Sequence, residues 1–275
     1  MASITAADIK RLREATGAGM TDCKKALVEA DGDYDKAVEQ LRIKGLKGVA
    51  KREGRAASNG LVIAKLDGTT KGTLLELNCE TDFVAKSPKF TELAQSVVDA
   101  AFGGNDVTAL QSVEVDGRPL NEVLDDANAS MGEKIEVRRV ATLSGAYVAT
   151  YLHRTNPDLP PQLGVLVELS GEDADVAKDL AQHIAAFSPT YVTREEVPDE
   201  VVAKERSIAE ATAKEEGKPE AALSKIVEGR VNGFFKEQVL LEQAFAKDAK
   251  KTVAKVLSEA GVEVKGFARF KVGQA

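Results

Sequence analysis

The chain has 275 residues, a formal net charge of −7 at pH 7, 43% hydrophobic residues and 29% charged residues. These proportions indicate a globular protein large enough for two domains, and the acidic balance argues against a general nucleic-acid binder, whose domains are usually basic. We find no apolar run of about 18 residues and no signal-peptide pattern, so we expect a cytoplasmic protein without a membrane partner.

The first 44 residues predict three short helices. Thr5 can cap the first, with Asp8 three positions later, Thr21 can cap the second, and Asp33 starts the third. Apolar residues at helical spacing would form a small shared core: Ile9, Leu12, Ala15, Cys23, Ala26, Leu27, Ala30, Tyr34, Ala37, Val38 and Leu41. Residues 1–45 resemble the ubiquitin-associated (UBA) type of three-helix bundle, a fold that docks on other proteins.

A basic stretch with glycines follows at residues 44–55. It can be a solvated linker with a frayed helical end, or a basic strip that contacts a partner. We assign residues 46–57 as a linker.

Residues 58–142 alternate between strands and helices and form the first predicted αβ subdomain. Strands at 61–66 and 71–79 are joined by a turn and make a hairpin. Apolar residues at helical spacing predict helices from Pro88 to about residue 102 and from Pro119 to about residue 130. A strand at 135–141 alternates with period two.

Residues 143–275 repeat this plan as a second αβ subdomain. Strands at 147–153 and 163–169 form a hairpin around a proline-rich loop, and a helix covers 174–187. Further predicted elements are a helix at about 249–260 and a closing strand at 262–272. The similar order of hairpin, helix and strand suggests an old duplication.

Two highly charged helices, at about 198–216 and 220–236, interrupt the second subdomain. They predict an antiparallel helical hairpin whose facing apolar residues are Val201, Val202, Ile208, Ala211, Leu223, Ile226, Val227, Val231 and Phe234. The hairpin can be a solvated protrusion or a contact for a second copy or a partner. The predicted fold class is therefore α+β: a UBA-like bundle and two related αβ subdomains with antiparallel sheets, the second bearing this hairpin.

The segment at residues 76–86 leads from a strand to the helix that Ser87 caps and Pro88 begins. Its predicted loop carries Asp82 and Phe83. An aromatic side chain there either packs into the protein's own core or is offered to a partner.

No catalytic constellation stands out, so we expect a protein that is not an enzyme. The glycines at residues 16–21 lack the P-loop spacing and follow a helix, and Asp125 and Asp126 suit a solvated helix face. His153 and His183 have no evident catalytic partner, and Ser144, Ser170 and Ser188 have no nucleophile-elbow context. Without a Cys and His cluster we expect no metal, and we expect no cofactor. Cys23 and Cys79 suit small apolar positions in a reducing compartment.

Two segments resemble the signatures of the bacterial translation elongation factor Ts family, in the expected order. One is residues 12–27, and the other is residues 76–86. The resemblance continues through residues 132–139, 217–219, 227–230 and 266–270, and it covers nearly the whole chain.

The resemblance implies a guanine-nucleotide exchange factor for elongation factor Tu, the GTPase that carries aminoacyl-tRNA. Phe83 would wedge between two helices of the GTPase domain, helped by Thr81, Asp82 and Val84, and disturb the Mg²⁺ and phosphate site so that GDP leaves. The bundle would contact the GTPase through the signature residues Leu12, Arg13, Thr16, Gly17 and Met20. His153 matches a contact residue of the second subdomain.

Two features differ from some family members. Longer members continue into a C-terminal helical module, whose contact with the GTPase we expect to be missing here, and the loop at 154–162 is longer and richer in proline.

Two other function classes remain open: a non-catalytic docking protein that uses the bundle, and a small-molecule enzyme.

Overall fold

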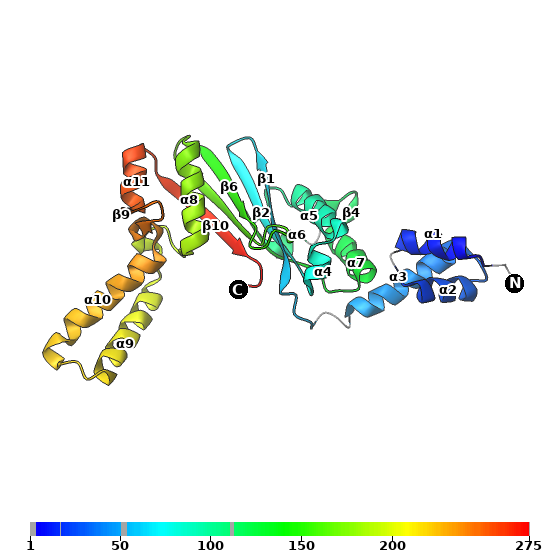
Figure 1. The fold of residues 1–275 in the computed structure, drawn as a ribbon, viewed down its shortest axis with the longest axis horizontal. Helices are drawn as coiled ribbons and strands as arrows, with labels where there is room; N and C mark the ends of the chain where they lie inside the picture. The colour runs from blue at the N-terminus through cyan, green and yellow to red at the C-terminus, as the bar shows by residue number, and fades with distance from the viewer. Residues whose placement is uncertain (1–3, 17, 51–53, 111–112, 275) are drawn as a thin grey trace.

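The computed structural model describes residues 4–16, 18–50, 54–110 and 113–274. The described chain is elongated, with a helical bundle at one end, two sheets in the middle and a helical hairpin at the other end (Figure 1). This arrangement confirms the predicted α+β class.

The N-terminal bundle contains α1 (Ala6–Thr16), α2 (Met20–Glu29) and α3 (Tyr34–Ala50). The predicted cap of α1 is confirmed, because the Asp8 amide donates to Thr5 Oγ1 (3.2 Å) and the Thr5 amide donates to Asp8 Oδ2 (2.9 Å). The predicted cap of α2 by Thr21 is wrong. That helix already begins at Met20, and its N-cap is Gly19, which has no side chain to accept a hydrogen bond.

The third helix is longer than the sequence predicted. Helix α3 continues to Ala50, through about half of the basic stretch at residues 44–55. It packs against α7 (Leu120–Met131), where Arg42 lies 3.7 Å from a Glu122 carboxylate oxygen and 3.6 Å from one of Asp126. Support from a neighbouring helix explains why a segment with two glycines stays helical, since packing overrides weak propensity.

Each sheet has three antiparallel strands in the same topology. The first contains β1 (Asn59–Asp67), β2 (Lys71–Cys79) and β5 (Glu136–Ser144), with β2 in the centre. The second contains β6 (Tyr147–His153), β7 (Leu163–Leu169) and β10 (Val264–Lys271), with β7 in the centre. In both, a hairpin comes first and a later strand pairs with its second strand, which agrees with the repeated plan that the sequence suggested.

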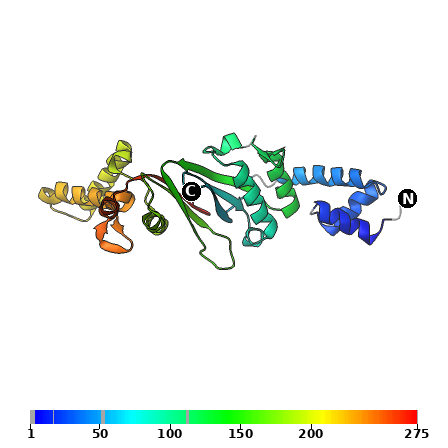
Figure 2. The same cartoon turned by 90° about the horizontal axis from the view of Figure 1, so that it is seen from above.

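The two sheets pack face to face between helices (Figures 1 and 2). Helices α5 (Pro88–Ala100) and α7 cover the outer face of the first sheet, and α8 (Ala174–Phe187) and α11 (Val253–Ala260) cover that of the second. The inner faces meet in a separate buried cluster, whose core residues are Val62, Leu74, Val148, Leu166 and Phe270.

Close approach of the sheets depends on glycine. A Cβ atom on Gly164 would lie 2.6 Å from Val62 Cγ1 and 2.9 Å from Leu74 Cδ1. Both distances are shorter than ordinary van der Waals contact, so any side chain at this position would push the sheets apart.

The C-terminal region corrects one predicted helix. Residues 249–252 are not helical, because β9 (Asp248–Thr252) pairs with β8 (Ala244–Phe245). Helix α11 begins at Val253, and Thr252 Oγ1 accepts from the Lys255 amide (3.2 Å). Short elements that the sequence did not predict are α6 (Val107–Leu110), β3 (Glu114–Val115), β4 (Arg118–Pro119) and 3₁₀ turns at Arg194–Glu196 and Leu240–Glu242.

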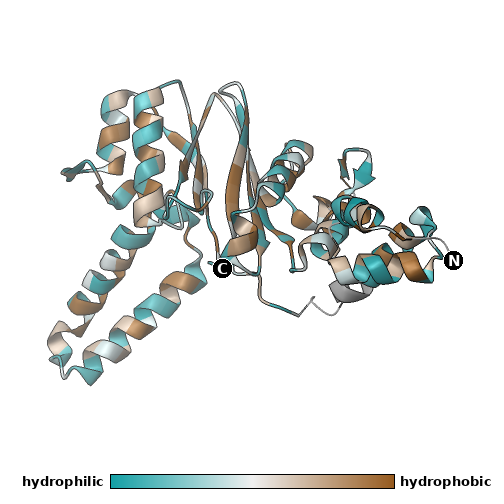
Figure 3. Ribbon diagram, turned by 45° about the vertical axis from the view of Figure 1, so that its right-hand side comes forward, coloured by the Kyte–Doolittle hydropathy of each residue, from teal (hydrophilic) through white to brown (hydrophobic). Residues whose placement is uncertain are grey.

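The predicted helical hairpin is confirmed as α9 (Asp199–Glu215) and α10 (Glu220–Gln238), projecting beyond the sheets (Figure 3). Its facing residues were predicted only in part. Ile208 and Ala211 are exposed, and the small hairpin core consists of Ala209, Val227 and Val231, with Val202 and Phe235 packed against it. The stripe on α9 was misassigned because the buried positions of this helix, Ala209 and Ala213, are small residues, whereas the larger Ile208 is exposed.

His183 of α8 lies in a buried hydrogen-bond network. Its Nδ1 accepts from the Ala246 amide (3.1 Å), so Nε2 carries the proton and donates to Gln243 Oε1 (2.8 Å). Burial lowers the pKa of the imidazole below its ordinary value of 6.5. A second proton on Nδ1 would face the Ala246 amide donor, so the folded protein favours the neutral ring.

Gly164→Ala should lower the free energy of unfolding by about 1–3 kcal/mol through overpacking between the sheets. Gly229→Ala is the matched control, since a Cβ atom there meets nothing within 4 Å in the middle of α10. That change should stabilise the protein by up to about 1 kcal/mol. Urea unfolding of both variants tests the contact, and equal effects would contradict it.

Acid should destabilise the protein through His183. The pKa of His183 is lower in the folded protein than in the unfolded chain. The contribution of His183 to the free energy of unfolding is therefore full above pH 6.5 and decreases as the pH falls below it. The loss should reach up to about 1.4 kcal/mol per pH unit. Urea unfolding at pH 7.5 and 5.5 measures it. His183→Gln should remove this part of the slope whereas His153→Gln should keep it, and the same slope in all three proteins would refute the assignment.

Candidate partner-binding site on a one-turn helix

Residues 82–85 form a one-turn helix where the sequence predicted a loop. This helix, α4 (Asp82–Ala85), follows the end of β2 directly. Thr81 is its N-cap: the residue is extended, and its Oγ1 accepts from the Val84 amide at 3.4 Å. The sequence analysis missed this cap because a single turn offers no periodicity to read.

Helix α4 turns Phe83 outward. The Phe83 side chain is 79% exposed, the highest value among the exposed large hydrophobic residues of the described chain. Ala85 is fully buried, and Val84 packs against the cluster under the first sheet. The interpretation of Phe83 as a core residue is therefore wrong, because its neighbours fill the core positions of this turn.

Two charged side chains flank the exposed ring. Lys86 Nζ donates to Asp82 Oδ2 (2.7 Å) and lies 5.8 Å from the centre of the Phe83 ring. The hydrogen bond from Lys86 lowers the pKa of Asp82, so this carboxylate is ionised at neutral pH. The site thus presents an aromatic ring beside a carboxylate and an ammonium group.

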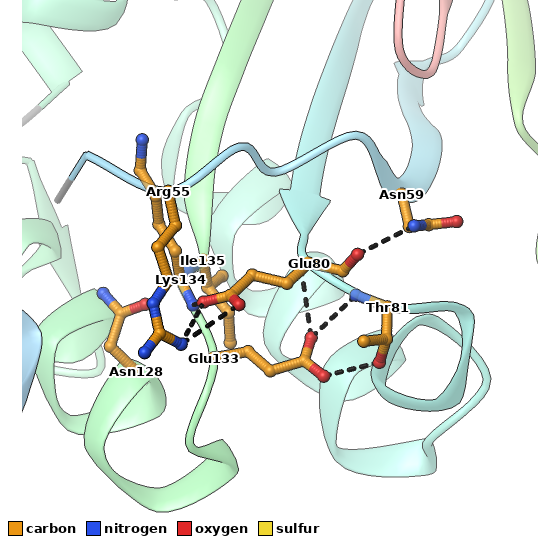
Figure 4. A network of polar contacts seen from close by, with 8 residues as sticks. All are labelled: Arg55, Asn59, Glu80, Thr81, Asn128, Glu133, Lys134 and Ile135. Atoms are coloured by element: carbon orange, nitrogen blue, oxygen red, sulfur yellow. Dashed lines mark hydrogen bonds and ion pairs between the residues drawn. The ribbon is translucent and has the colours of Figure 1, made fainter. Parts of the chain in front are cut away.

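Glu133 anchors the base of α4 (Figure 4). Its Oε2 accepts from the amides of Glu80 (3.1 Å) and Thr81 (2.9 Å), and its Oε1 accepts from the Thr81 hydroxyl (2.5 Å). Glu133 lies just after Gly132, the left-handed C-cap of α7. It belongs to a segment that the sequence analysis matched to a known family, but no role was predicted for it.

Glu80 ties the same base to other segments (Figure 4). Its Oε1 accepts from the Lys134 amide (2.7 Å), its carboxylate pairs with Arg55 (3.2 Å), and its carbonyl accepts from Asn59 Nδ2 (2.8 Å). The end of the predicted linker, the start of β1 and the segment between α7 and β5 therefore meet where α4 begins.

Cys79 lies buried beneath this turn. Its thiol donates to the Thr81 carbonyl (3.2 Å), and burial, aided by the Glu133 charge, raises its pKa to about 12. A thiol with such a pKa stays protonated and is a poor nucleophile. It serves the packing of the turn, as the sequence analysis expected.

The N-terminal candidate residues occupy different environments. Leu12 is fully buried in the bundle core, Arg13 is exposed and Met20 is 48% exposed. Thr16 is partly buried, and its hydroxyl donates to the Leu12 carbonyl (2.7 Å). Gly17 lies outside the described residues. Leu12 can therefore affect binding only by holding the bundle together.

The structure brings one N-terminal candidate close to the start of α5. Arg13 lines a cavity together with Lys10, Glu14 and Lys89, and Lys89 follows α4 by only four residues. The exposed side of α1 and the start of α5 therefore border the same cavity. Lys89 is a residue that the sequence analysis did not single out.

His153 lies elsewhere, at the end of β6 in the second sheet. It is exposed, and its Nδ1 is 2.9 Å from the Tyr151 hydroxyl oxygen. Because α4 packs on the first sheet, the structure does not join His153 to the Phe83 turn.

Two features of other function classes are absent from the described residues. No group of three or more His, Cys, Asp or Glu side chains there could hold a metal ion. Each helix in that part of the chain is too short or too polar to span a bilayer.

Comparisons with known proteins agree on one family. The family model described as "Elongation factor TS" matches residues 80–274. The chain is 62% identical to the elongation factor Ts of Acidothermus cellulolyticus, with 100% of both chains covered. It is 61% identical to that of Streptomyces griseus (99% and 100% covered) and 60% identical to that of Thermobifida fusca (100% of both).

Phe83→Ala should change the free energy of unfolding by less than about 0.5 kcal/mol, because the side chain makes little contact with the protein's own core. Phe90→Ala is the matched control, since Phe90 is fully buried in α5, and it should cost about 3–5 kcal/mol. Urea unfolding of the two variants compares them. A large loss in Phe83→Ala would mean that the ring supports the fold.

Proposed function

The chain belongs to the elongation factor Ts family, and we propose that it binds elongation factor Tu in the GDP-bound form and promotes release of GDP. It remains bound to the nucleotide-free GTPase until GTP enters. It acts by binding alone, without covalent chemistry, and in the cytoplasm.

The exposure of Phe83 is the observation that supports this proposal most. Burying such a ring in a partner contributes about 2 kcal/mol or more when it fills a pocket at the centre of an interface. An exposed phenylalanine gives the free protein no comparable benefit. A ring held out on an anchored turn suits insertion into another protein.

The proposed mechanism uses the whole α4 turn. Phe83 inserts between two helices of the GTPase domain, while Thr81, Asp82 and Val84 line the contact. The displaced helices disturb the Mg²⁺ and phosphate site, and the ionised Asp82 adds a negative charge that opposes the bound anion. Binding is reciprocal, so GDP must weaken the complex by the same factor by which the complex weakens GDP.

Two further contacts complete the proposal. The bundle, residues 1–45, binds the GTPase domain through Arg13, Thr16, Gly17 and Met20, with Leu12 maintaining its shape. The second subdomain, residues 143–275, contacts another part of the GTPase through His153. The linker of residues 46–57 joins the bundle to the first subdomain, residues 58–142, which carries α4. For the hairpin at about 198–236 both predicted alternatives stay open: a solvated protrusion, or a contact for a second copy or a partner.

Adding the protein to elongation factor Tu loaded with a fluorescent GDP analogue should accelerate release of the analogue. Phe83→Ala should reduce this acceleration at least about tenfold, because the substitution removes the aromatic anchor of the interface. Phe187→Ala is the matched control, because it removes another exposed phenylalanine from α8, and it should keep the acceleration.

Release at the intrinsic rate with the wild-type protein would refute the exchange function. Formation of a stable complex without faster release would favour the docking function of the bundle instead. A Phe83→Ala variant as active as wild type would refute the role of the ring but not the function.

A further inference from the structure

We propose that Glu133 is the positioning residue that fixes α4, and through it Phe83, in the orientation that nucleotide exchange requires. The expected effect of Glu133 on GDP release rests on the proposed function. Its structural role, the fixing of α4, rests on the contacts of Glu133 alone.

Helix α4 cannot hold its own shape. Forming a first helical turn fixes several dihedral angles for a single hydrogen bond, so an isolated turn is unfavourable. The first amides of any helix also lack partners within the helix. A four-residue helix therefore needs bonds from outside, at both its buried side and its N-terminus.

The buried side is held by packing, which restrains only part of the motion. Ala85 is fully buried and Val84 packs on the first core. These contacts set which face of the turn is buried, but apolar atoms cannot accept from the amides that lead into it. Holding the start of the turn, and with it the Phe83 ring, also requires directional bonds.

Glu133 supplies those bonds. Its carboxylate accepts from two consecutive amides, those of Glu80 and Thr81, and from the Thr81 hydroxyl. Because that hydroxyl donates its proton to Glu133, its lone pairs face the Val84 amide that it caps. One carboxylate thus orients both the backbone that enters α4 and the cap that closes it. Bonds to a charged acceptor are stronger than neutral ones.

Glu133 is itself held in place on both sides. Gly132, before it, ends α7 with φ at 78°. After it, the Lys134 amide donates to Glu80 Oε1 (2.7 Å), and the Ile135 amide donates to Asn128 Oδ1. The carboxylate is therefore a fixed point on the scaffold, 52 residues away in sequence from the Thr81 hydroxyl that it binds.

The test compares Glu133→Ala with Glu136→Ala, alone and combined with Phe83→Ala. Glu136 is a matched control, because it is a nearby carboxylate on β5 whose ion pair is with Lys134 (2.8 Å). Each variant is measured for the maximal rate of GDP release from elongation factor Tu, for the concentration giving half that rate, and for amide hydrogen exchange in residues 80–86.

Glu133→Ala should lower the maximal rate about tenfold and change the half-saturating concentration less than about twofold, since the other contacts remain. Amide hydrogens of residues 80–86 should exchange about tenfold faster. In the Phe83→Ala background the same substitution should change the rate less than about twofold, because Glu133 acts through that ring. Glu136→Ala should match wild type.

Three outcomes would overturn the proposal. The first is a Glu133→Ala variant that matches Glu136→Ala in rate and hydrogen exchange. The second is an equal loss with and without Phe83, which would indicate a general structural role. The third is unchanged hydrogen exchange in residues 80–86. If wild type fails to accelerate GDP release, the proposed function fails, and hydrogen exchange alone still decides whether Glu133 fixes α4.

Discussion

The contact between the inner faces of the two sheets is the constraint on which the rest of the structure depends. It buries the second face of the central strands, β2 and β7, whose first faces are covered by helices. A buried ion pair lies in this contact: Glu76 is fully buried, and Arg139 donates to it (2.7 Å) and to the Lys271 carbonyl in the opposite sheet (2.9 Å). A charge pair of this kind is weak evidence for stability, but here it connects the two sheets through the bond from Arg139 to the Lys271 carbonyl. The strand that leads into α4 is therefore fixed on both sides.

This rigidity gives the α4 turn its proposed role. A ring that displaces helices of a partner must be held rigidly by its own protein. A flexible loop would change its own conformation instead of moving those helices. Packing of Ala85 and the carboxylate of Glu133 hold the turn from two directions, while Phe83 stays exposed. The turn is thus already ordered in the free protein, so binding does not incur the entropy cost of ordering it.

The N-terminal bundle is joined to this scaffold differently. Helix α3 meets α7 through pairs of Arg42 with Glu122 and Asp126, all largely exposed. Exposed pairs of this kind contribute about 0–1 kcal/mol each and weaken in salt. The ion pairs between the bundle and α7 are therefore weak, whereas α4 is held by part-buried hydrogen bonds to the Glu133 carboxylate and by the buried Ala85. In the proposed complex the bundle adds a contact, and the α4 turn displaces the helices of the GTPase domain.

The sequence by itself determined the elements with strong local signals. Alternating strands, the capping pair of Thr5 and Asp8, and the Ser87 start of α5 were all predicted correctly, because such signals act within a few residues. The two family segments also identify the elongation factor Ts family from the sequence alone. Only the tertiary structure showed that residues 82–85 are helical and that the Glu133 carboxylate bonds to the residues that enter this helix, and it decided between the two interpretations of Phe83 in favour of the exposed one. Each of these depends on bonds between segments far apart in the chain, and neither periodicity nor spacing encodes such bonds.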